Sequence, residues 1–562
     1  MRYGIGLAWL LAWGVSVGTA AENKETLEKA DEHLLKIAKF SSTDTQTLLE
    51  FVKKRTLTEH EKIEIGATIQ NLGADSFRAR TVATRKLISR GPVISRLLKE
   101  AITHSDLEIS NRAKKCLDAI GEKRPPHNTP ATVIRLLGRR APLEATEILL
   151  HHVPYAENLD VIQETKTALV KIAKSNPKAR EILKKNLNHF TSEVRAVAGF
   201  AYVLSSRKVD PTVVTQLRLD RSALVQMEVG KALAYSADKT GVQTVIQSLS
   251  GLDDLNALQA EDWLHQVGQG QSPPKLFVGK TKEERKAAQD VWAKWWSENQ
   301  KKVPLSQLKL PVSTRGPTVV IFLDNNKVQE IDAGNRLGWK LENLGFPLDV
   351  ELLDNGRVLL TEYENSRITE RDESGKIVWW QKVDRPIAAQ RLTNGHTFIV
   401  TDMALYEYDT KQQLVFTHSL PNQERILKAT KRPNGDIVCL TEQARVVRLS
   451  ASGRGVDIRD KFDVKHSKPL FGGKLYFTPA GRVLIPHNAE NKVIEYDHKG
   501  NPVWELDIQG PVAAVRLPNG NTLVTTMGDN MTARPTVEVD RAGNLVWKYG
   551  YPSGRVTRAL RR

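Results

Sequence analysis

The sequence predicts two domains of different fold class, an all-α solenoid followed by an all-β six-bladed propeller that the C-terminal strand closes. Three observations lead to this prediction. Apolar residues recur at helical spacing from Glu22 to about Gln300, they alternate at strand spacing from Pro317 onward, and tight turns then recur about every 40 residues. The chain of 562 residues is 40% hydrophobic and 26% charged, so it is long enough for both domains and is not disordered in composition.

Residues 1–21 have the features of a signal peptide. Met1 and Arg2 give a positive start, residues 4–17 form an apolar core, and Thr19-Ala20-Ala21 is a small-residue cleavage site. We therefore expect cleavage near Ala21 and export to the periplasm or the extracellular space. The apolar run is shorter than a membrane span needs and no later run approaches that length, so no transmembrane segment is predicted after removal of the signal. An uncleaved anchor is the alternative.

Residues 22–300 are predicted to form short helix pairs. An apolar stripe after Asp75-Ser76 stops at Gly91-Pro92, and a second stripe follows directly. The segments 192–198 and 225–234 show the same pattern further along the chain. Because a short helix pair cannot bury an apolar face alone, such pairs stack into a solenoid.

The last predicted helix begins near Thr281, which can form a capping box with Glu284. Trp292, Trp295 and Trp296 share one face of this helix. They could form an aromatic platform for a ligand, or they could seal the end of the solenoid. We favour the seal, because aromatic residues at helical spacing usually pack in a core.

Residues 301–316 contain prolines and no acidic residue, and they are predicted to link the solenoid to a propeller over residues 317–562. Asn-Gly turns join the first and second strands of each unit, with Ala480-Gly481 in one place, and Asp-x-x-Gly turns precede the fourth strand. Each fourth strand carries a large aromatic residue: Trp339, Trp379, Phe416, Trp504 and Trp547. Four strands per repeat are typical of a propeller blade.

The strand count predicts how the ring closes. The first unit, Thr318 to Glu342, holds only three strands, and five complete units follow it. Residues 555–560 are left over and are similar to the inner-strand runs of the other units. We predict that this C-terminal strand completes the first blade and covers two strand edges that would otherwise be unpaired.

The formal net charge of +17 comes mostly from the helical half. This charge could serve contact with nucleic acid or with anionic envelope polymers, but the cations are interleaved with acidic residues, as on ordinary solvated helix faces. Together with predicted export, this argues against nucleic acid as a partner. Cys116 and Cys439 lie far apart, which excludes a disulfide framework and a thiolate zinc site, and we expect both to be buried.

The propeller half resembles the bacterial PQQ-like and arylsulfotransferase-like propellers. The resemblance lies in Pro-Asn-Gly-Asn at residues 518–521 and in Asp-x-x-Gly-x-x-Val-Trp at residues 540–547. The helical half resembles HEAT-repeat proteins. The whole layout is similar to a group of exported bacterial proteins of unassigned function, in which a HEAT-like region ending in Trp-x-x-Trp-Trp precedes such a propeller. The blade motif at residues 518–521 and 540–547 indicates a fold and leaves the activity open.

The resemblance implies two enzyme classes that the residues do not support. PQQ-dependent dehydrogenases of this kind stack PQQ against a Trp and an adjacent Cys pair, and this chain has no adjacent cysteines, so we expect no cofactor. Arylsulfotransferases need central His and Arg, and the matching stretches 347–349, 386–388 and 511–513 contain no His. We therefore favour an exported, non-catalytic binding or assembly scaffold with a protein or an envelope polymer as partner. A propeller enzyme related to these families is the alternative.

A ligand site is predicted at the mouth of the propeller channel. The candidates on the inner strands are polar residues: Asp349, Glu351, Gln390, Lys428 and Lys474. His487, after Pro486, lies where a second strand could approach the rim. The alternative is that the polar residues only solvate the channel and that the histidine is structural. No catalytic residue and no metal ligand is predicted.

Overall fold

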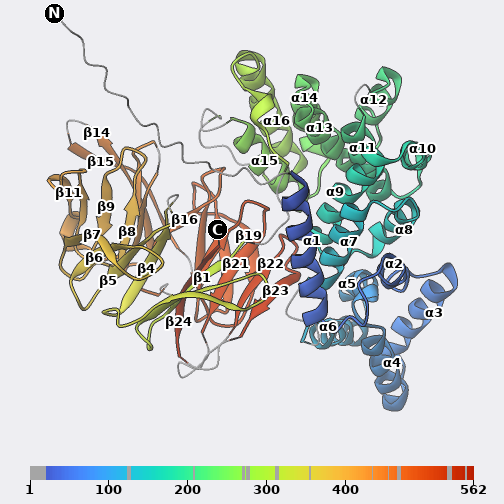
Figure 1. Ribbon diagram of the computed structural model, residues 1–562, viewed down its shortest axis with the longest axis horizontal. Helices are drawn as coiled ribbons and strands as arrows, with labels where there is room; N and C mark the ends of the chain where they lie inside the picture. Colours follow the sequence, from blue (N-terminus) through green and yellow to red (C-terminus); the bar gives the residue numbers. More distant parts are fainter. Residues whose placement is uncertain are drawn as a thin grey trace, which may run out of the picture.

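The computed structural model describes residues 20–122, 128–206, 209–268, 273, 279–310, 316–353, 356–432, 434–452, 455–464, 470–527, 535–550 and 554–561. Most of the predicted signal peptide, residues 1–19, and residues 311–315 of the predicted linker lie outside this part. The described chain forms a helical region followed by a six-bladed β-propeller, as the sequence predicts (Figure 1).

The helical region is a stack of short helices. Several begin behind a residue whose side chain accepts a hydrogen bond from a free backbone N–H, such as Asp44, Asn158 and Asp238. The helices are α1 (Ala20–Ile37), α2 (Thr45–Lys53), α3 (Glu59–Gln70), α4 (Phe77–Arg90), α5 (Ser95–Ile102), α6 (Leu107–Glu122), α7 (Thr129–Arg140), α8 (Ala145–His152), α9 (Leu159–Ser175), α10 (Pro177–Lys185), α11 (Ser192–Ser205), α12 (Pro211–Arg218), α13 (Ala223–Tyr235), α14 (Lys239–Ser248), α15 (Asp254–Gly268) and α16 (Lys282–Asn299).

Alternate helices of the stack lie on its two sides. Helices α7, α9, α11, α13 and α15 line the side toward the propeller, while α8, α10 and α12 lie on the far side (Figure 1). Leucine, valine and alanine side chains of α7, α9, α11 and α13 share one continuous core. N-terminal helix α1 crosses the propeller side of the stack (Figure 1) and packs against α7. None of the described helices is long and apolar enough to cross a bilayer.

The tryptophans of α16 seal the end of the helical region, as favoured from the sequence. Thr281 and Glu284 form the predicted capping box. Trp292, Trp295 and Trp296 are buried in a core that also holds Val303 and Leu305, which lie in the predicted linker. The start of that linker therefore packs on the helical region.

The propeller consists of six antiparallel four-stranded sheets. Its Asn-Gly turns have the expected geometry, since Gly520 adopts a φ of +89°, which residues with a side chain rarely adopt. Blade 1 has β1 (Thr318–Phe322), β2 (Lys327–Ile331), β3 (Leu337–Leu341) and β24 (Val556–Arg561); blade 2 has β4 (Pro347–Leu352), β5 (Val358–Glu362), β6 (Arg367–Arg371) and β7 (Ile377–Lys382); blade 3 has β8 (Ala388–Arg391), β9 (Thr397–Val400), β10 (Leu405–Tyr408) and β11 (Leu414–His418); blade 4 has β12 (Ile426–Lys431), β13 (Ile437–Thr441), β14 (Arg445–Ser452) and β15 (Gly455–Asp463); blade 5 has β16 (Tyr476–Phe477), β17 (Val483–His487), β18 (Lys492–Tyr496) and β19 (Pro502–Asp507); blade 6 has β20 (Pro511–Arg516), β21 (Thr522–Thr526), β22 (Thr536–Val539) and β23 (Leu545–Tyr549).

The C-terminal strand closes the ring. β24 pairs antiparallel with β1, with Val320 opposite Ala559 and Thr318 opposite Arg561, and the strand order of the blade is β24-β1-β2-β3. Val556 and Ala559 of β24 are buried in a core shared with Trp547 of blade 6. The predicted closure is confirmed.

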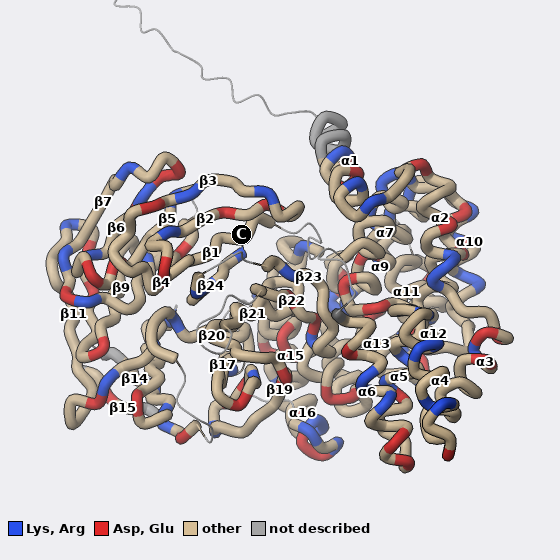
Figure 2. The backbone as a smooth tube through the Cα atoms, turned by 90° about the horizontal axis from the view of Figure 1, so that it is seen from below, with Lys and Arg blue, Asp and Glu red and all other residues tan. Residues whose placement is uncertain are grey.

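Charged residues are interspersed over the helical region. Figure 2 shows blue and red stretches mixed along the helices, as expected for solvated helix faces. Cys116 and Cys439 are both free and buried, as predicted.

Candidate functional site

Four of the predicted ligand residues meet in the propeller channel. Asp349 and Glu351 come from β4, Lys428 from β12, and Lys474 from the segment before β16. The Lys474 ammonium lies 2.6 Å from a Glu351 carboxylate oxygen and 3.4 Å from Asp349, and it donates to the Ala389 carbonyl at 2.7 Å. Arg558 of β24 lies 3.1 Å from the other Asp349 oxygen.

These residues hold a segment of the chain itself inside the channel. The backbone N–H groups of Gly472 and Gly473 donate to carbonyls of the inner-strand regions of blades 4 and 3, at 3.0 and 2.9 Å. The Lys428 ammonium donates to the Gly472 carbonyl. At Gly473, φ is +80°, a backbone conformation that residues with a side chain rarely adopt. Lys474 is therefore part of this crossing segment, and the prediction that placed it on an inner strand is wrong.

Burial changes the chemistry of Lys428. Its side chain is buried, and this desolvation, with the Arg558 cation close by, lowers the pKa of Lys428 to about 7. The carbonyl of Gly472 takes one of its hydrogen bonds. The predicted channel residues thus have internal partners that explain their polarity without a ligand.

Gln390 and His487 do not join this group. Gln390 bridges two blades, since its amide accepts from the Lys431 N–H at 3.2 Å and donates to the Lys431 carbonyl at 3.0 Å. His487 lies at the end of β17, fully buried, with its Nε2 2.9 Å from the Tyr496 hydroxyl. These contacts agree with the structural interpretation of both residues.

A second site, which the sequence did not reveal, lies between the helical region and the propeller. It is a cavity of about 840 Å³. Residues of α1, α7, α9, α11, α13 and α15 form one side. The other side consists of Ala333, the β20–β21 turn at residues 518–521, and Arg541. Cavities of this size at the boundary between domains are typical ligand sites.

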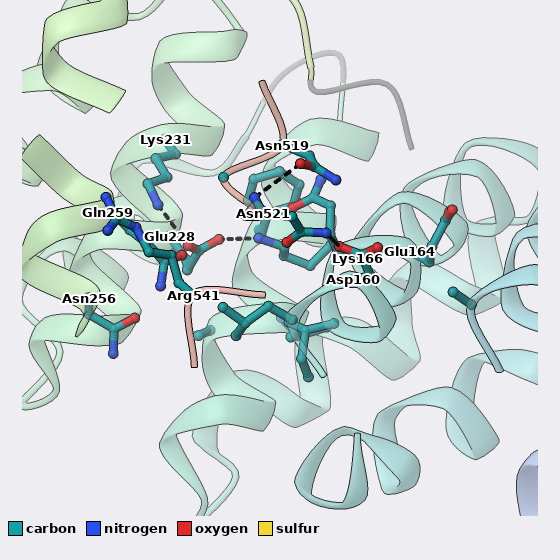
Figure 3. A pocket seen from close by; sticks show the side chains of 18 of the residues that line it. Asp160, Glu164, Lys166, Glu228, Lys231, Asn256, Gln259, Asn519, Asn521 and Arg541 are labelled. Carbon is teal, nitrogen blue, oxygen red and sulfur yellow. Dashed lines mark hydrogen bonds and ion pairs between the residues drawn. The ribbon is translucent and has the colours of Figure 1, made fainter. Parts of the chain in front are cut away.

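Ion pairs line this cavity (Figure 3). The Glu228 carboxylate of α13 lies between two ammonium groups, with Lys166 of α9 at 2.6 Å and Lys231 at 3.1 Å. Burial alone would raise the pKa of Glu228, but the two cations outweigh burial and lower it to about 2. Lys166 also lies over the Phe200 ring, 4.8 Å from its centroid.

A second group of charges ties α1 to the stack. Asp31 of α1 accepts from Arg135, at 2.9 Å, and from Arg139, both on α7. Arg135 also pairs with Glu164 of α9. The N-terminal helix is thereby fixed as one wall of the cavity.

Aromatic rings form the end of the cavity near α15. Phe200, Tyr235 and Trp263 follow one another edge to face, with centroids 6.5 and 6.3 Å apart. The indole N–H of Trp263 donates to the Tyr235 hydroxyl at 3.1 Å. The rings come from α11, α13 and α15, three neighbouring helices of the stack.

Buried contacts fix the propeller against the helical region and so give the cavity its shape. Asn521 donates to Asp160 at 2.8 Å, and the Leu159 N–H donates to Asp540 at 2.9 Å. Asp262 of α15 lies 2.5 Å from Arg482 and 2.6 Å from Arg541 of the propeller. Leu258 of α15 packs in a core cluster with residues of blades 5 and 6.

The sequence carried only a weak indication of this cavity. Glu164 and Glu228 are acidic residues in helices whose buried residues are mostly apolar, and such a departure from the pattern is a reason to expect a functional surface. Lys231 lies one turn from Glu228 on the same helix, but the other partners, Arg135 and Lys166, lie on different helices, at sequence distances that no local pattern shows.

Comparisons with known proteins give the chain no family. No family model matches it, and no curated protein matches it. Among solved structures, it is similar to a protein of unknown function from Bacteroides caccae, with a TM-score of 0.38 and 14% identity over 44% of this chain and 99% of that chain. Virginiamycin B lyase from Staphylococcus aureus has a TM-score of 0.30 and 16% identity over 37% of this chain and 70% of that chain. A functionally unknown protein from Desulfotomaculum acetoxidans has a TM-score of 0.32 and 14% identity over 42% and 80%.

Similarities this low carry no argument about activity. The resemblance of the sequence to HEAT-repeat, PQQ-like and arylsulfotransferase-like proteins is not confirmed by them. The candidate site therefore has to be interpreted from its own residues.

Proposed function

We propose that this protein is an exported, non-catalytic binding protein that holds its ligand in the cavity between the helical region and the propeller. One observation carries the proposal. The cavity of about 840 Å³ is walled by both domains and mixes charged, amide and aromatic side chains. Pre-formed concave sites with apolar walls and a few polar groups are how proteins hold ligands of moderate size.

The state of the cavity's charges favours binding over catalysis. A general acid or base works best with a pKa near the working pH. Lys166 and Lys231 hold the pKa of Glu228 at about 2, far from that range. The residue thus serves as a fixed anion within an ion cluster.

Export is the part of the proposal that the first residues support. The segment 1–21 has the composition of a signal peptide, and the mature chain would begin at or near the start of α1. An exported protein meets cell-envelope material, so the ligand class we propose is an envelope polymer or a part of one.

The test is to block the cavity with a side chain. Ala30 lies exposed on α1 and lines the cavity, so Ala30→Trp inserts an indole without disturbing a core. Ala287→Trp is the matched control, because Ala287 is also exposed in a helix, α16, and lies away from the cavity. Purified protein is incubated with fragmented cell envelope, and the retained material is measured by mass spectrometry. Ala30→Trp should lose most of the retained material and Ala287→Trp should keep it; equal retention by both would overturn the proposal.

A further inference from the structure

The charges of the cavity wall are satisfied within the protein. Among the described residues, every charged side chain that lines the cavity, except the exposed Arg221, has an oppositely charged or an amide partner. Besides the clusters around Glu228 and Asp31, Glu193 lies 3.3 Å from Arg96, and Asp253 accepts from Asn256 at 2.8 Å. Arg221 is exposed, and within the described part of the chain it forms no ion pair.

This pairing disfavours a charged ligand. In the buried part of the cavity, away from the exposed Arg221, a ligand that carries charge would lose its hydration and would find no free counter-charge, which is costly. It could gain one only by breaking a buried ion pair such as Lys166–Glu228. The ligand that fits this wall is uncharged.

The wall nevertheless keeps hydrogen-bonding capacity. The amide nitrogens of Gln163 and Gln259 are buried at the cavity and, within the described residues, donate to no atom. Paired carboxylates such as Glu164 and Glu228 accept from their cations and still have free lone pairs, since a carboxylate has about four acceptor positions. The ligand therefore has to offer acceptors to amides and several donors to carboxylates.

Apolar side chains alternate with these polar groups. Leu27, Ile162 and Leu224 line the cavity and are partly or fully exposed, and Phe200 and Trp263 lie behind them. Such a wall can cover the C–H faces of a ring while its edges form hydrogen bonds.

From these observations we infer that the cavity takes an uncharged, hydroxyl-rich saccharide chain, an inference that rests on the proposed function. A saccharide ring has several hydroxyls, each of which donates and accepts, together with apolar C–H faces. An extended peptide has one N–H per residue and so supplies fewer donors to a wall rich in carboxylates. The donor count favours the saccharide over a neutral peptide.

Matched probes separate charge from shape. N-acetylglucosamine oligomers are compared with glucosamine oligomers of the same length, and methyl-esterified galacturonate oligomers with their free acids. A panel of neutral glucose and xylose oligomers and a capped neutral peptide completes the set. Binding to the full chain is measured by calorimetry at low and high salt. At least one neutral oligosaccharide should bind more tightly than any charged probe, with little dependence on salt, because no ion pair forms with the ligand.

Variants then locate the binding. Gln259→Leu removes one amide donor and should weaken saccharide binding roughly two- to tenfold, the range for one hydrogen bond. Gln70→Leu is its control, because Gln70 is exposed at the end of α3 and away from the cavity. Both variants are first checked for unchanged circular dichroism and melting temperature.

Each outcome decides between the two claims. If no neutral oligosaccharide binds, or if a charged probe binds best with a steep salt dependence, the saccharide inference is wrong. If only the peptide binds and Ala30→Trp abolishes that binding, the saccharide inference is also wrong, but the proposed function stands. If a saccharide binds equally well to Ala30→Trp, the ligand lies outside the cavity and the proposed function fails.

Discussion

Removal of the C-terminal strand should unfold the propeller or lower its stability severely. Deletion of residues 554–562 takes away β24, whose register pairs five residues of β1, from Thr318 to Phe322, with the tail. At about 1 kcal/mol for each ladder hydrogen bond, this loss is roughly 5 kcal/mol. Exposure of the apolar surface that Val556 buries adds about 1.5–3 kcal/mol. The total is comparable to the whole stability of a typical domain.

Two buried carboxylates make the loss larger. Arg558 pairs with Asp349 and Arg561 pairs with Glu538, and both carboxylates are 1% exposed. Deletion would leave Glu538 without this cation in a dry environment, which is unfavourable.

Thermal and urea unfolding of the deletion variant provide the assay. For a domain of this size each kcal/mol shifts the melting temperature by about 2–4 °C, so the propeller transition should fall by more than about 10 °C or be absent. Ala559→Asp is a milder variant, because it places a charge at a position that is 1% exposed, and Ala542→Asp at an exposed turn is its control. If the truncated chain keeps the melting temperature and solubility of the full chain, our account of the closure is wrong.

Three further predictions concern processing, the linker and pH. Intact-mass analysis of exported protein should show cleavage within a residue or two of Ala21, and persistence of residues 1–21 would contradict this. Limited proteolysis should cut first within residues 306–316, beyond the buried Val303 and Leu305, and give a resistant fragment starting near Pro317 on a denaturing gel, whereas uniform digestion would argue against a linker. Burial of Glu261, together with the nearby carboxylates of Asp262 and Glu495, outweighs its Arg482 partner and raises the pKa of Glu261 from 4.5 to about 7. The stability that this raised pKa contributes is present below about pH 4.5 and is lost as pH rises through 7. In a plot of melting temperature against pH, Glu261→Gln should therefore reduce the fall between these two pH values. An unchanged plot would contradict the prediction.

The propeller was predictable because each of its signals is local. An Asn-Gly turn, an alternating run and an Asp-x-x-Gly turn lie within one blade, and the unpaired tail at residues 555–560 follows from counting strands. The burial of Trp292 and its neighbours was predictable for the same reason, since one helix carries all of them. The number and register of helical repeats were less clear, because helix pairs show only a divergent apolar stripe.

The sequence places Asp349 and Glu351 on one inner strand, but it does not show which residues they contact. Period-2 alternation places Asp349 and Glu351 toward the channel, and it cannot show that residues 472–474 return through that channel to meet them. Polarity on an inner strand therefore has two explanations, a ligand or a segment of the same chain. The crossing segment supplies a hydrogen-bond partner to Lys428, and the inner-strand residues Glu351 and Ala389 supply partners to Lys474, so a ligand is not needed to explain why these two residues are polar.

The interdomain cavity could not be predicted because it depends on how two domains meet. Asp262 of α15 reaches Arg482 and Arg541, more than two hundred residues further along the chain. Glu495 of the propeller lies between Arg516 and Arg541 in the same buried network, at 2.7 and 2.6 Å.

Separating the domains would leave buried charges without partners, which is costly, so this network holds the two walls at a fixed distance. A cavity held in this way is already formed before ligand arrives, and pre-organisation reduces the ordering cost of binding. The same argument makes the cavity a property of the intact chain. The isolated propeller would keep Ala333, Arg541 and the turn at residues 518–521 as its share of the wall, and the isolated helical region would lack all of them.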